Sequence, residues 1–467
     1  MSPRIERQGT DNRRSLPPFG KFRARLERRK RQGNKRATSW PDASYRLIEA
    51  INPGSRELAK SMTWYGFWVA EQITSLRPCL VNLIPDYDND DNDLWQPQFL
   101  NLWDRIALHL RTNTDTRIDT IIDLLIKDEI FQLDQERKNL FQARQVVFSV
   151  IGWQTMIWKA ETGVCPPGQL AISDERNGFQ GENELSFRQD QSCCKRSLQQ
   201  VIMGFGILLP SSPQCRLELR RESQATEGTT AALSSSPNYN CLPTISPASL
   251  NMFMLSTVGG IRIQWTDVLS HHLELNNKDR IIYLYRFPSF CLLNVPATSD
   301  EESKTERHTP IYACCDSTVN NKYWAGQDDI RDLLRETLLS YRVLFGQDKR
   351  SRKMYKRLRP FGDCSKREQD VLLNELCSRE HCDLTANEDR DNYDPCEDFP
   401  LYSNRFKVLH QVLMNTKART WKQLWKDKRD SAAWLTFWLL LIFGGLGVMF
   451  SFMQMILQVI AISLDRG

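Results

Sequence analysis

The longest uninterrupted hydrophobic pattern of the chain lies on its C-terminal side. Residues 431–464 contain no Asp, Glu, Lys, Arg or His. An apolar helix of about twenty residues can cross a hydrocarbon layer of about 30 Å while its backbone groups bond to one another. The alternative interpretation is a buried core helix, but core helices are usually shorter and carry a polar face. The pattern therefore predicts one transmembrane helix, over residues 432–455.

The two flanks of this apolar block differ in charge. The basic juxtamembrane segment, residues 416–430, carries six basic and two acidic side chains, whereas the other flank offers only Asp465 and Arg466. Basic residues beside a span stay on the cytosolic side of the membrane. The first forty residues contain no apolar run that could act as a signal peptide. We expect a tail-anchored, single-pass protein with a cytosolic body, located in the endoplasmic reticulum or a later secretory membrane.

Small and amide residues share one face of the predicted span. Gly444, Gly447, Ser451, Gln454 and Gln458 follow one another at spacings of three and four residues. Small residues let two helices approach closely, and amides can bond across the pair, so this face could support self-association. Against this, a span that starts at residue 432 leaves both glutamines near the headgroups. The sequence leaves both interpretations open.

Shorter hydrophobic periods organise the rest of the chain. Apolar side chains repeat at three- and four-residue spacing over 95–110 and 117–158, which predicts helices. Apolar and polar residues alternate over 259–265 and, less strictly, over 269–275, and a further strand is expected over 280–286. The fold class is therefore predicted to be α+β. We expect a mainly helical cytosolic body with a small antiparallel sheet, plus one C-terminal transmembrane helix.

Composition suggests how this body is divided. The 41% apolar and 25% charged residues of the whole chain are typical of globular proteins. We expect a helical part over 41–221 and an α+β part over 241–415. Between them, residues 222–240 are rich in Ser, Thr, Ala and Gly and predict a disordered insertion.

The N-terminal segment, residues 1–40, is strongly basic. From Arg4 to Arg36 it holds thirteen basic residues against three acidic ones. The simplest interpretation is a solvated, disordered arm. Contact with anionic lipid is an alternative. Nuclear import or nucleic-acid binding is a third, which the lack of interleaved aromatic residues makes weak.

Two histidines are the first candidates for chemistry in the body. His271 and His272 lie within the predicted sheet, close to Asp267 and Glu274. A catalytic or metal-binding role would need a third group to converge on one of them. We expect structural pairing instead.

Cysteines and acidic residues supply two further candidate metal-binding sites. The densest group comprises Cys364, Cys377, His381, Cys382 and Cys396, but structural zinc sites typically use two short-spaced pairs and only 377–382 is short. We therefore expect free thiols in a reducing compartment.

The acidic tract over residues 86–93 suggests a calcium-binding loop. A calcium loop counted from Asp86 needs Gly at its sixth position and Glu at its twelfth, where the chain has Asp91 and Pro97. A solvated loop is the better interpretation. The sequence predicts no catalytic, cofactor-binding or metal-binding residue.

Opposite charges gather in two neighbouring runs. A basic cluster over 349–359 precedes an acidic tract over 388–398. Such runs are usually solvated faces, while a phosphate-bearing partner or the anionic membrane surface is the alternative.

Three stretches carry a resemblance to a known group of proteins. They are residues 258–274 together with Phe287-Pro-Ser-Phe-Cys291, residues 344–353, and residues 420–430 leading into the span. The chain resembles a broad group of uncharacterised filamentous-fungal proteins that have a cytosolic body and a single C-terminal transmembrane helix. The resemblance implies no catalytic residue, although His272 and the Phe-Pro-Ser-Phe corner recur in the group. Because some members are encoded in variable gene clusters, an accessory role in colony or hyphal surface traits is one functional hypothesis.

The motifs of the common enzyme classes do not occur in the sequence. It has no Gly-rich phosphate loop with Lys, no Gly-x-Ser-x-Gly and no His-Glu-x-x-His. The leading hypothesis is a non-enzymatic membrane protein whose body binds protein partners or senses a cytosolic signal. A membrane-tethered enzyme and a nucleic-acid-binding protein are the alternatives, and nucleic acid is the weaker of the two.

Overall fold

The computed structural model describes most of the body and the C-terminal helix. The described residues are 40–88, 95–113, 115–134, 138–162, 165–173, 187–207, 209, 244–295, 309–315, 325–380, 382, 389–416 and 431–464. Three predicted segments lie outside this set: the basic arm up to residue 39, the insertion over 222–240, and the juxtamembrane segment from residue 417 to 430.

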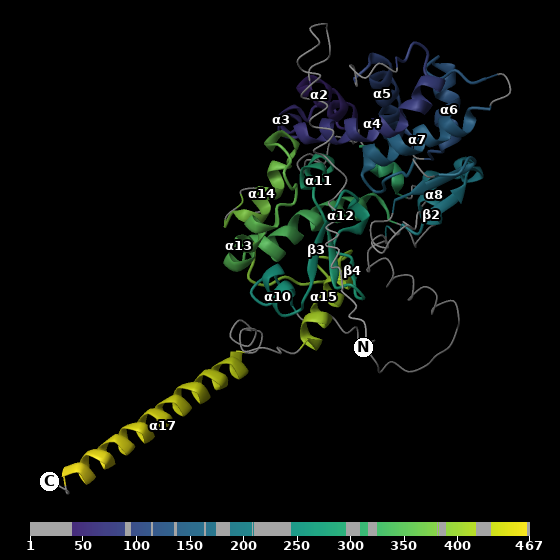
Figure 1. Cartoon of the computed structure of the whole chain (residues 1–467). Coiled ribbons are helices and arrows are strands. Elements are labelled where there is room, and N and C mark those ends of the chain that lie inside the picture. Colours follow the sequence, from purple (N-terminus) through teal and green to yellow (C-terminus); the bar gives the residue numbers. More distant parts are fainter. Residues whose placement is uncertain are drawn as a thin grey trace, which may run out of the picture.

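The N-terminal part of the body is a layer of helices (Figure 1). Its helices are α2 (Trp40–Ile51), α3 (Arg56–Ser61), α4 (Thr63–Leu83), α5 (Pro97–Thr112), α6 (Ile118–Lys127) and α7 (Leu140–Thr155). Apolar residues at helical spacing turn one side of each amphipathic helix inward. Helix α7 packs against α4, α5 and α6, and is buried along most of its length. The helices predicted over 95–158 are confirmed.

A small sheet interrupts this helical part. Strands β1 (Gln169–Ile172) and β2 (Phe187–Asp190) pair antiparallel, and η1 (Gln191–Lys195) and α8 (Leu198–Gly204) follow. The helical part expected over 41–221 therefore also contains one short two-stranded sheet. Each strand has four residues, which is too few for an alternating pattern to stand out in the sequence.

The second sheet lies at two of the three segments where the sequence predicts strands; over the third, 269–275, the prediction was wrong, because residues 269–271 form a 3₁₀ turn and strand pairing begins only at Leu275. Strands β3 (Arg262–Thr266), β4 (Leu275–Asn276) and β5 (Ile281–Tyr285) are arranged in the order β3-β5-β4. Strand β4 pairs antiparallel with β5, so the predicted α+β class with a small antiparallel sheet is confirmed. The longest ladder differs from the prediction, because β3 and β5 run parallel. The chain between them crosses from one end of the strands to the other through η2 (Leu269–His271) and β4, and an alternating pattern does not reveal such a crossover.

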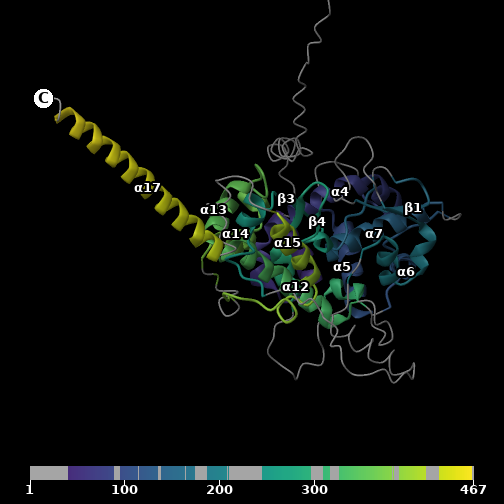
Figure 2. The same ribbon diagram turned by 90° about the horizontal axis from the view of Figure 1, so that it is seen from below.

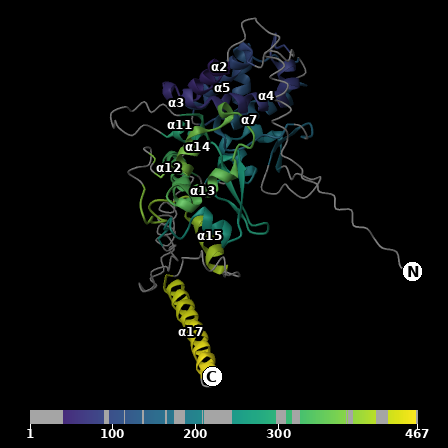
Figure 3. The same cartoon turned by 60° about the vertical axis from the view of Figure 1, so that its left-hand side comes forward.

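Helices surround this sheet and complete the body. They are α10 (Met252–Thr257), α11 (Pro288–Asn294), η3 (Pro310–Cys314), α12 (Gln327–Tyr341), the π-helical turn η4 (Arg342–Gly346), α13 (Lys349–Leu358), η5 (Lys366–Glu368), α14 (Val371–Ser378) and α15 (Ser403–Asn415). Seen from below, α13 and α14 lie at one end of the body, and α6 and β1 lie at the other (Figure 2). In Figure 3, α15 lies at the lower end of the body and α13 lies above it.

One hydrophobic core joins the two parts of the body. Trp64 of α4 stacks on Phe287, which follows β5, with ring centroids 3.9 Å apart. The indole N–H of Trp64 also donates to the Ser289 hydroxyl at 3.0 Å. Tyr65 lies beside them and donates from its hydroxyl to the Trp153 carbonyl at 2.8 Å. The aromatic residues over 62–69 and the Phe-Pro-Ser-Phe corner thus pack at one interface.

Candidate functional site

The C-terminal helix is the most distinctive candidate element. Helix α17 (Ser431–Leu464) includes a segment from Trp438 to Ala461 that is 24 residues long and has a mean hydropathy of 2.1. Among the described residues it is the one helix long and apolar enough to span a membrane. None of that segment is buried against the protein, and Val448 is 72% exposed. The alternative of a buried core helix is therefore contradicted.

The boundaries of the span change the position of its polar face. The segment from Trp438 to Ala461 starts six residues later than the predicted span, so Gly444, Gly447 and Ser451 lie near its middle. The Ser451 hydroxyl donates to the Gly447 carbonyl within the helix at 2.9 Å. A Cβ added at Gly444 or Gly447 would contact nothing within 4 Å. Self-association through this face stays a prediction.

Within the body, His272 is part of the core. Its ring is fully buried between Tyr341 and Tyr402. Its Nδ1 accepts from the backbone N–H of Tyr285 at 3.1 Å, so Nε2 carries the proton and donates to the Ser340 hydroxyl at 2.7 Å. Burial and then the nearby Arg405 charge hold the pKa of His272 well below its usual range. The neutral, fully bonded imidazole has a structural role, as the sequence predicts.

Helix α15 is tied to the body beside this histidine. Arg405 donates to the carbonyls of His272 and Ser270 and pairs with Glu274 at 3.2 Å. Glu336 of α12 accepts from two consecutive backbone N–H groups, those of Leu401 and Tyr402, at 2.9 and 2.7 Å. Burial raises the pKa of Glu336 to about 8, although these two hydrogen bonds oppose the shift. The last helix of the body is thereby fixed to the sheet and to α12.

The other metal candidates that the structure describes do not converge. His271 is buried at the end of η2, while Cys377 and Cys382 are buried and Cys396 is exposed. His381 and residues 89–93 of the acidic tract lie outside the described residues. The eleven described cysteines are free thiols. In the described part of the chain, no three His, Cys, Asp or Glu side chains are placed to hold a metal ion together.

A charged pair lies at the carboxyl edge of the parallel strands. Asp267 follows β3 and Arg286 follows β5, and the two side chains form an ion pair. The second Asp267 oxygen accepts from the Trp68 indole at 3.0 Å. Burial pushes the pKa of Asp267 upward, but the Arg286 and Lys159 charges outweigh it and hold the pKa below its usual value. This edge is where open α/β sheets bind ligands, yet both carboxylate oxygens already have protein donors.

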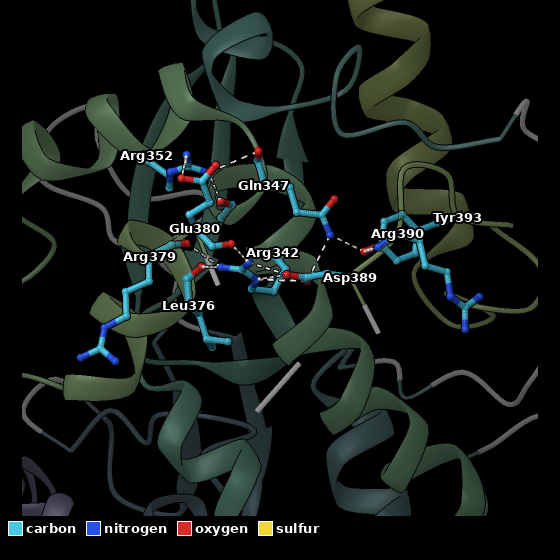
Figure 4. Close-up of polar contacts among 10 residues, drawn as sticks. Arg342, Gln347, Arg352, Leu376, Arg379, Glu380, Asp389, Arg390 and Tyr393 are labelled. Carbon is cyan, nitrogen blue, oxygen red and sulfur yellow. Dashed lines mark hydrogen bonds and ion pairs between the residues drawn. The ribbon is translucent and has the colours of Figure 1, made fainter. Parts of the chain in front are cut away.

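The most elaborate polar site is centred on Arg342, which sequence analysis did not single out. Arg342 begins the π-helical turn η4 and its side chain is 0% exposed (Figure 4). Its Nη1 donates to the carbonyls of Leu376 and Arg379 at 3.0 and 2.8 Å. Its Nη2 donates to the Glu380 carbonyl at 2.7 Å. These carbonyls come from the C-terminal end of α14 and the residues after it, so the guanidinium caps that helix.

The remaining donors of Arg342 bind one carboxylate. Its Nε lies 3.1 Å from one Asp389 oxygen, and its Nη2 donates to the other. Gln347 also donates to Asp389, at 3.1 Å, and to the Tyr393 hydroxyl. A guanidinium has five N–H donors, and all five of these have protein acceptors. The site therefore holds η4, α14 and the segment from residue 389 together, and leaves no donor for an anionic ligand.

A sequence pattern marks the position of Arg342 in retrospect. It follows Leu334 and Leu338 at four-residue steps, so it continues the buried face of α12. An arginine on an apolar face needs a buried partner. Its partner Asp389 is 47 residues away in the chain, and this pairing is not visible in the sequence.

Comparison with known proteins identified no relative of this chain. No protein-family model, curated protein or solved structure matches the chain. The resemblance to the filamentous-fungal group therefore stays a prediction. The fold and the candidate elements define the chain as an α+β protein with a mainly helical body and one candidate membrane-spanning helix at its C-terminal side.

Proposed function

We propose that the chain is a membrane protein anchored by α17, with its body on the cytosolic side of a secretory-route membrane. The observation that carries the proposal is the apolar segment from Trp438 to Ala461, none of which is buried against the protein. Large apolar side chains left in water are costly, and a bilayer removes that cost. The six basic residues over 416–430 support a cytosolic body.

We further propose that the body acts through binding or sensing and not through catalysis. Three polar groups that would be candidates for chemistry already have hydrogen-bond partners within the protein. His272 is bonded at both ring nitrogens, Asp267 at both oxygens, and Arg342 at all five donors. An enzyme needs groups that are free to contact a substrate. The filamentous-fungal resemblance fits a membrane-bound accessory protein, and it remains part of the proposal.

A glycosylation tag tests the topology. An Asn-x-Ser/Thr acceptor placed after Gly467 should be glycosylated in a eukaryotic host, because that side of the span faces the lumen. A matched acceptor added in front of residue 40 should stay unmodified. Modification of the N-terminal tag, or of neither tag, would contradict the proposed orientation.

A further inference from the structure

Helix α13 presents a cationic face that the proposed function leaves without a role. Five of its ten residues are exposed and basic: Lys349, Arg350, Lys353, Lys356 and Arg357. Its opposite face is fixed in the body. Ser351 and Tyr355 are buried there, and Asp348 caps the helix by accepting from the Ser351 N–H at 2.7 Å. The cations are therefore held in place by a rigid support.

Within the described part of the chain, most of these cations have no carboxylate partner. Among the described residues, Lys349, Lys353, Lys356 and Arg357 form no ion pair within 4 Å. Two carboxylates close to this face already have partners: Glu380 pairs with Arg352 of α13 itself, and Asp363 pairs with Arg359 (Figure 4 shows Glu380 and Arg352). Arg350 lies over the Phe253 ring, 5.4 Å from its centroid. A surface of like charges without partners fits an anionic partner.

The position of α13 points to the identity of that partner. Helix α10 contacts both α13 and α15, and Figure 1 shows the three in the same half of the body. Helix α15 ends at Asn415, and only fourteen residues, 417–430, separate Thr416 from the start of α17. Even fully extended, that connection spans no more than about 50 Å. The half of the body that carries α13 is therefore also the half from which the connection to α17 starts.

We propose that the exposed face of α13 docks on the anionic headgroups of the leaflet in which α17 is anchored. This inference rests on the proposed function. The tether keeps α13 close to the surface, so weak electrostatic attraction within a Debye length of about 8 Å is enough to orient the body. The basic residues over 417–430 attract the same leaflet and act in the same direction. The body is then held with α6 pointing away from the membrane.

Lysine footprinting of the full-length protein tests the docking. The protein is reconstituted through α17 in nanodiscs of phosphatidylcholine alone or with about 30% phosphatidylserine, and exposed lysines are acylated and quantified by mass spectrometry. Labelling of Lys349, Lys353 and Lys356 should fall about threefold or more in the anionic discs. It should recover in about 0.5 M NaCl, where charges are screened. Lys127 of α6 and Lys195 of η1, exposed at the other end of the body, should label equally in both discs.

A pair of charge variants provides the matched control. The triple variant Lys353→Gln, Lys356→Gln, Arg357→Gln should bring labelling of Lys349 in anionic discs up to the neutral-disc level. Neutralising three exposed cations at the other end, Lys127→Gln, Lys195→Gln, Arg196→Gln, should leave its protection unchanged.

Two results would overturn the inference. Equal labelling of α13 in neutral and anionic discs would show that lipid charge does not engage this face. Strong protection in both discs would show that a protein surface, such as the acidic segment of a second copy, covers it. Failure of the protein to enter the discs would be a different result, since it contradicts the proposed anchor itself.

Discussion

Helices α7 and α17 are both rich in apolar residues, but they meet opposite surroundings. From Val146 to Thr155 every residue of α7 is buried by protein, and its polar side chains find partners there. Ser149 donates to the Gln145 carbonyl at 2.8 Å, and Gln154 donates to the Trp103 carbonyl at 2.9 Å. In α17 the apolar side chains from Leu439 to Ile460 are 40–72% exposed.

This difference shows which sequence features distinguish a helix buried in protein from a helix that the protein does not cover. Apolar content already differs, because α7 includes Arg144 and three glutamines whereas α17 has no charged residue. Length separates the two helices further: α7 has 16 residues and α17 has 34. A span needs about twenty apolar residues, and a core helix is limited by the size of the domain. The apolar residues of α7 are buried within the body, whereas the segment from Trp438 to Ala461 is long and apolar enough to span a membrane and is not buried by the protein.

The largest expected effect comes from placing charge in α17. Lys at the centre of a span costs about 2.5–3.5 kcal/mol of insertion free energy per residue. The double variant Leu446→Lys, Met449→Lys should therefore lose most of its membrane insertion, measured as the glycosylated fraction of the C-terminal tag. The matched variant Leu446→Ala, Met449→Ala should stay inserted. Unchanged insertion of the lysine variant would contradict a spanning helix.

The second largest expected effect is a loss of unfolding free energy when the buried Arg342 is replaced. Arg342→Met removes five hydrogen bonds and leaves Asp389 and three carbonyls without their donor. Breaking a buried ion pair on one side costs about 3–5 kcal/mol of unfolding free energy. Urea titration of the detergent-solubilised protein, followed by tryptophan fluorescence, measures the loss.

The control for this prediction is a neighbouring arginine. Arg379 is 62% exposed and its side chain pairs only with Glu375, at 3.2 Å, among the described residues. Arg379→Met should cost less than about 1 kcal/mol, as surface ion pairs do. Equal losses for the two variants would show that the Arg342 site does not hold the body together.

The smallest expected effect is a pH dependence of the free energy of unfolding, caused by His272. Because its pKa is lowered in the folded protein, the unfolded chain, with a pKa of about 6.5, binds a proton first as the pH falls. The His272 contribution to stability is therefore present above about pH 6.5 and is lost progressively below it. The stability difference between the wild type and His272→Gln should narrow from pH 7 to pH 5.

Comparing the two proteins isolates this contribution. Burial raises the pKa of Asp370 to about 6, so Asp370 makes the fold more stable as the pH falls and acts in the opposite sense. It is present in both proteins and cancels in the difference. Parallel pH profiles for the wild type and the variant would mean that His272 titrates alike in the folded and unfolded chains.

The sequence predicts features that depend on neighbouring residues, and it misses features that depend on residues far apart in the chain. Local patterns predicted α17, the helices from Pro97 to Thr155, and the strands β3 and β5. They also predicted the structural role of His272. The parallel pairing of β3 with β5 and the Arg342–Asp389 pair depend on residues far apart in the chain, which no local period encodes. The π-helical turn at Arg342 escaped prediction for a related reason, since tertiary packing selects it over a regular helix.

Alkaline carbonate extraction of the unaltered full-length protein tests the central claim most directly. Carbonate strips proteins that are held at membrane surfaces by charge and leaves integral ones in place. If α17 spans the bilayer, the protein remains in the membrane pellet at alkaline pH and leaves it only with detergent. Recovery of the protein in the carbonate supernatant would contradict the account, because the exposed segment from Trp438 to Ala461 would then be covered by protein instead of lipid.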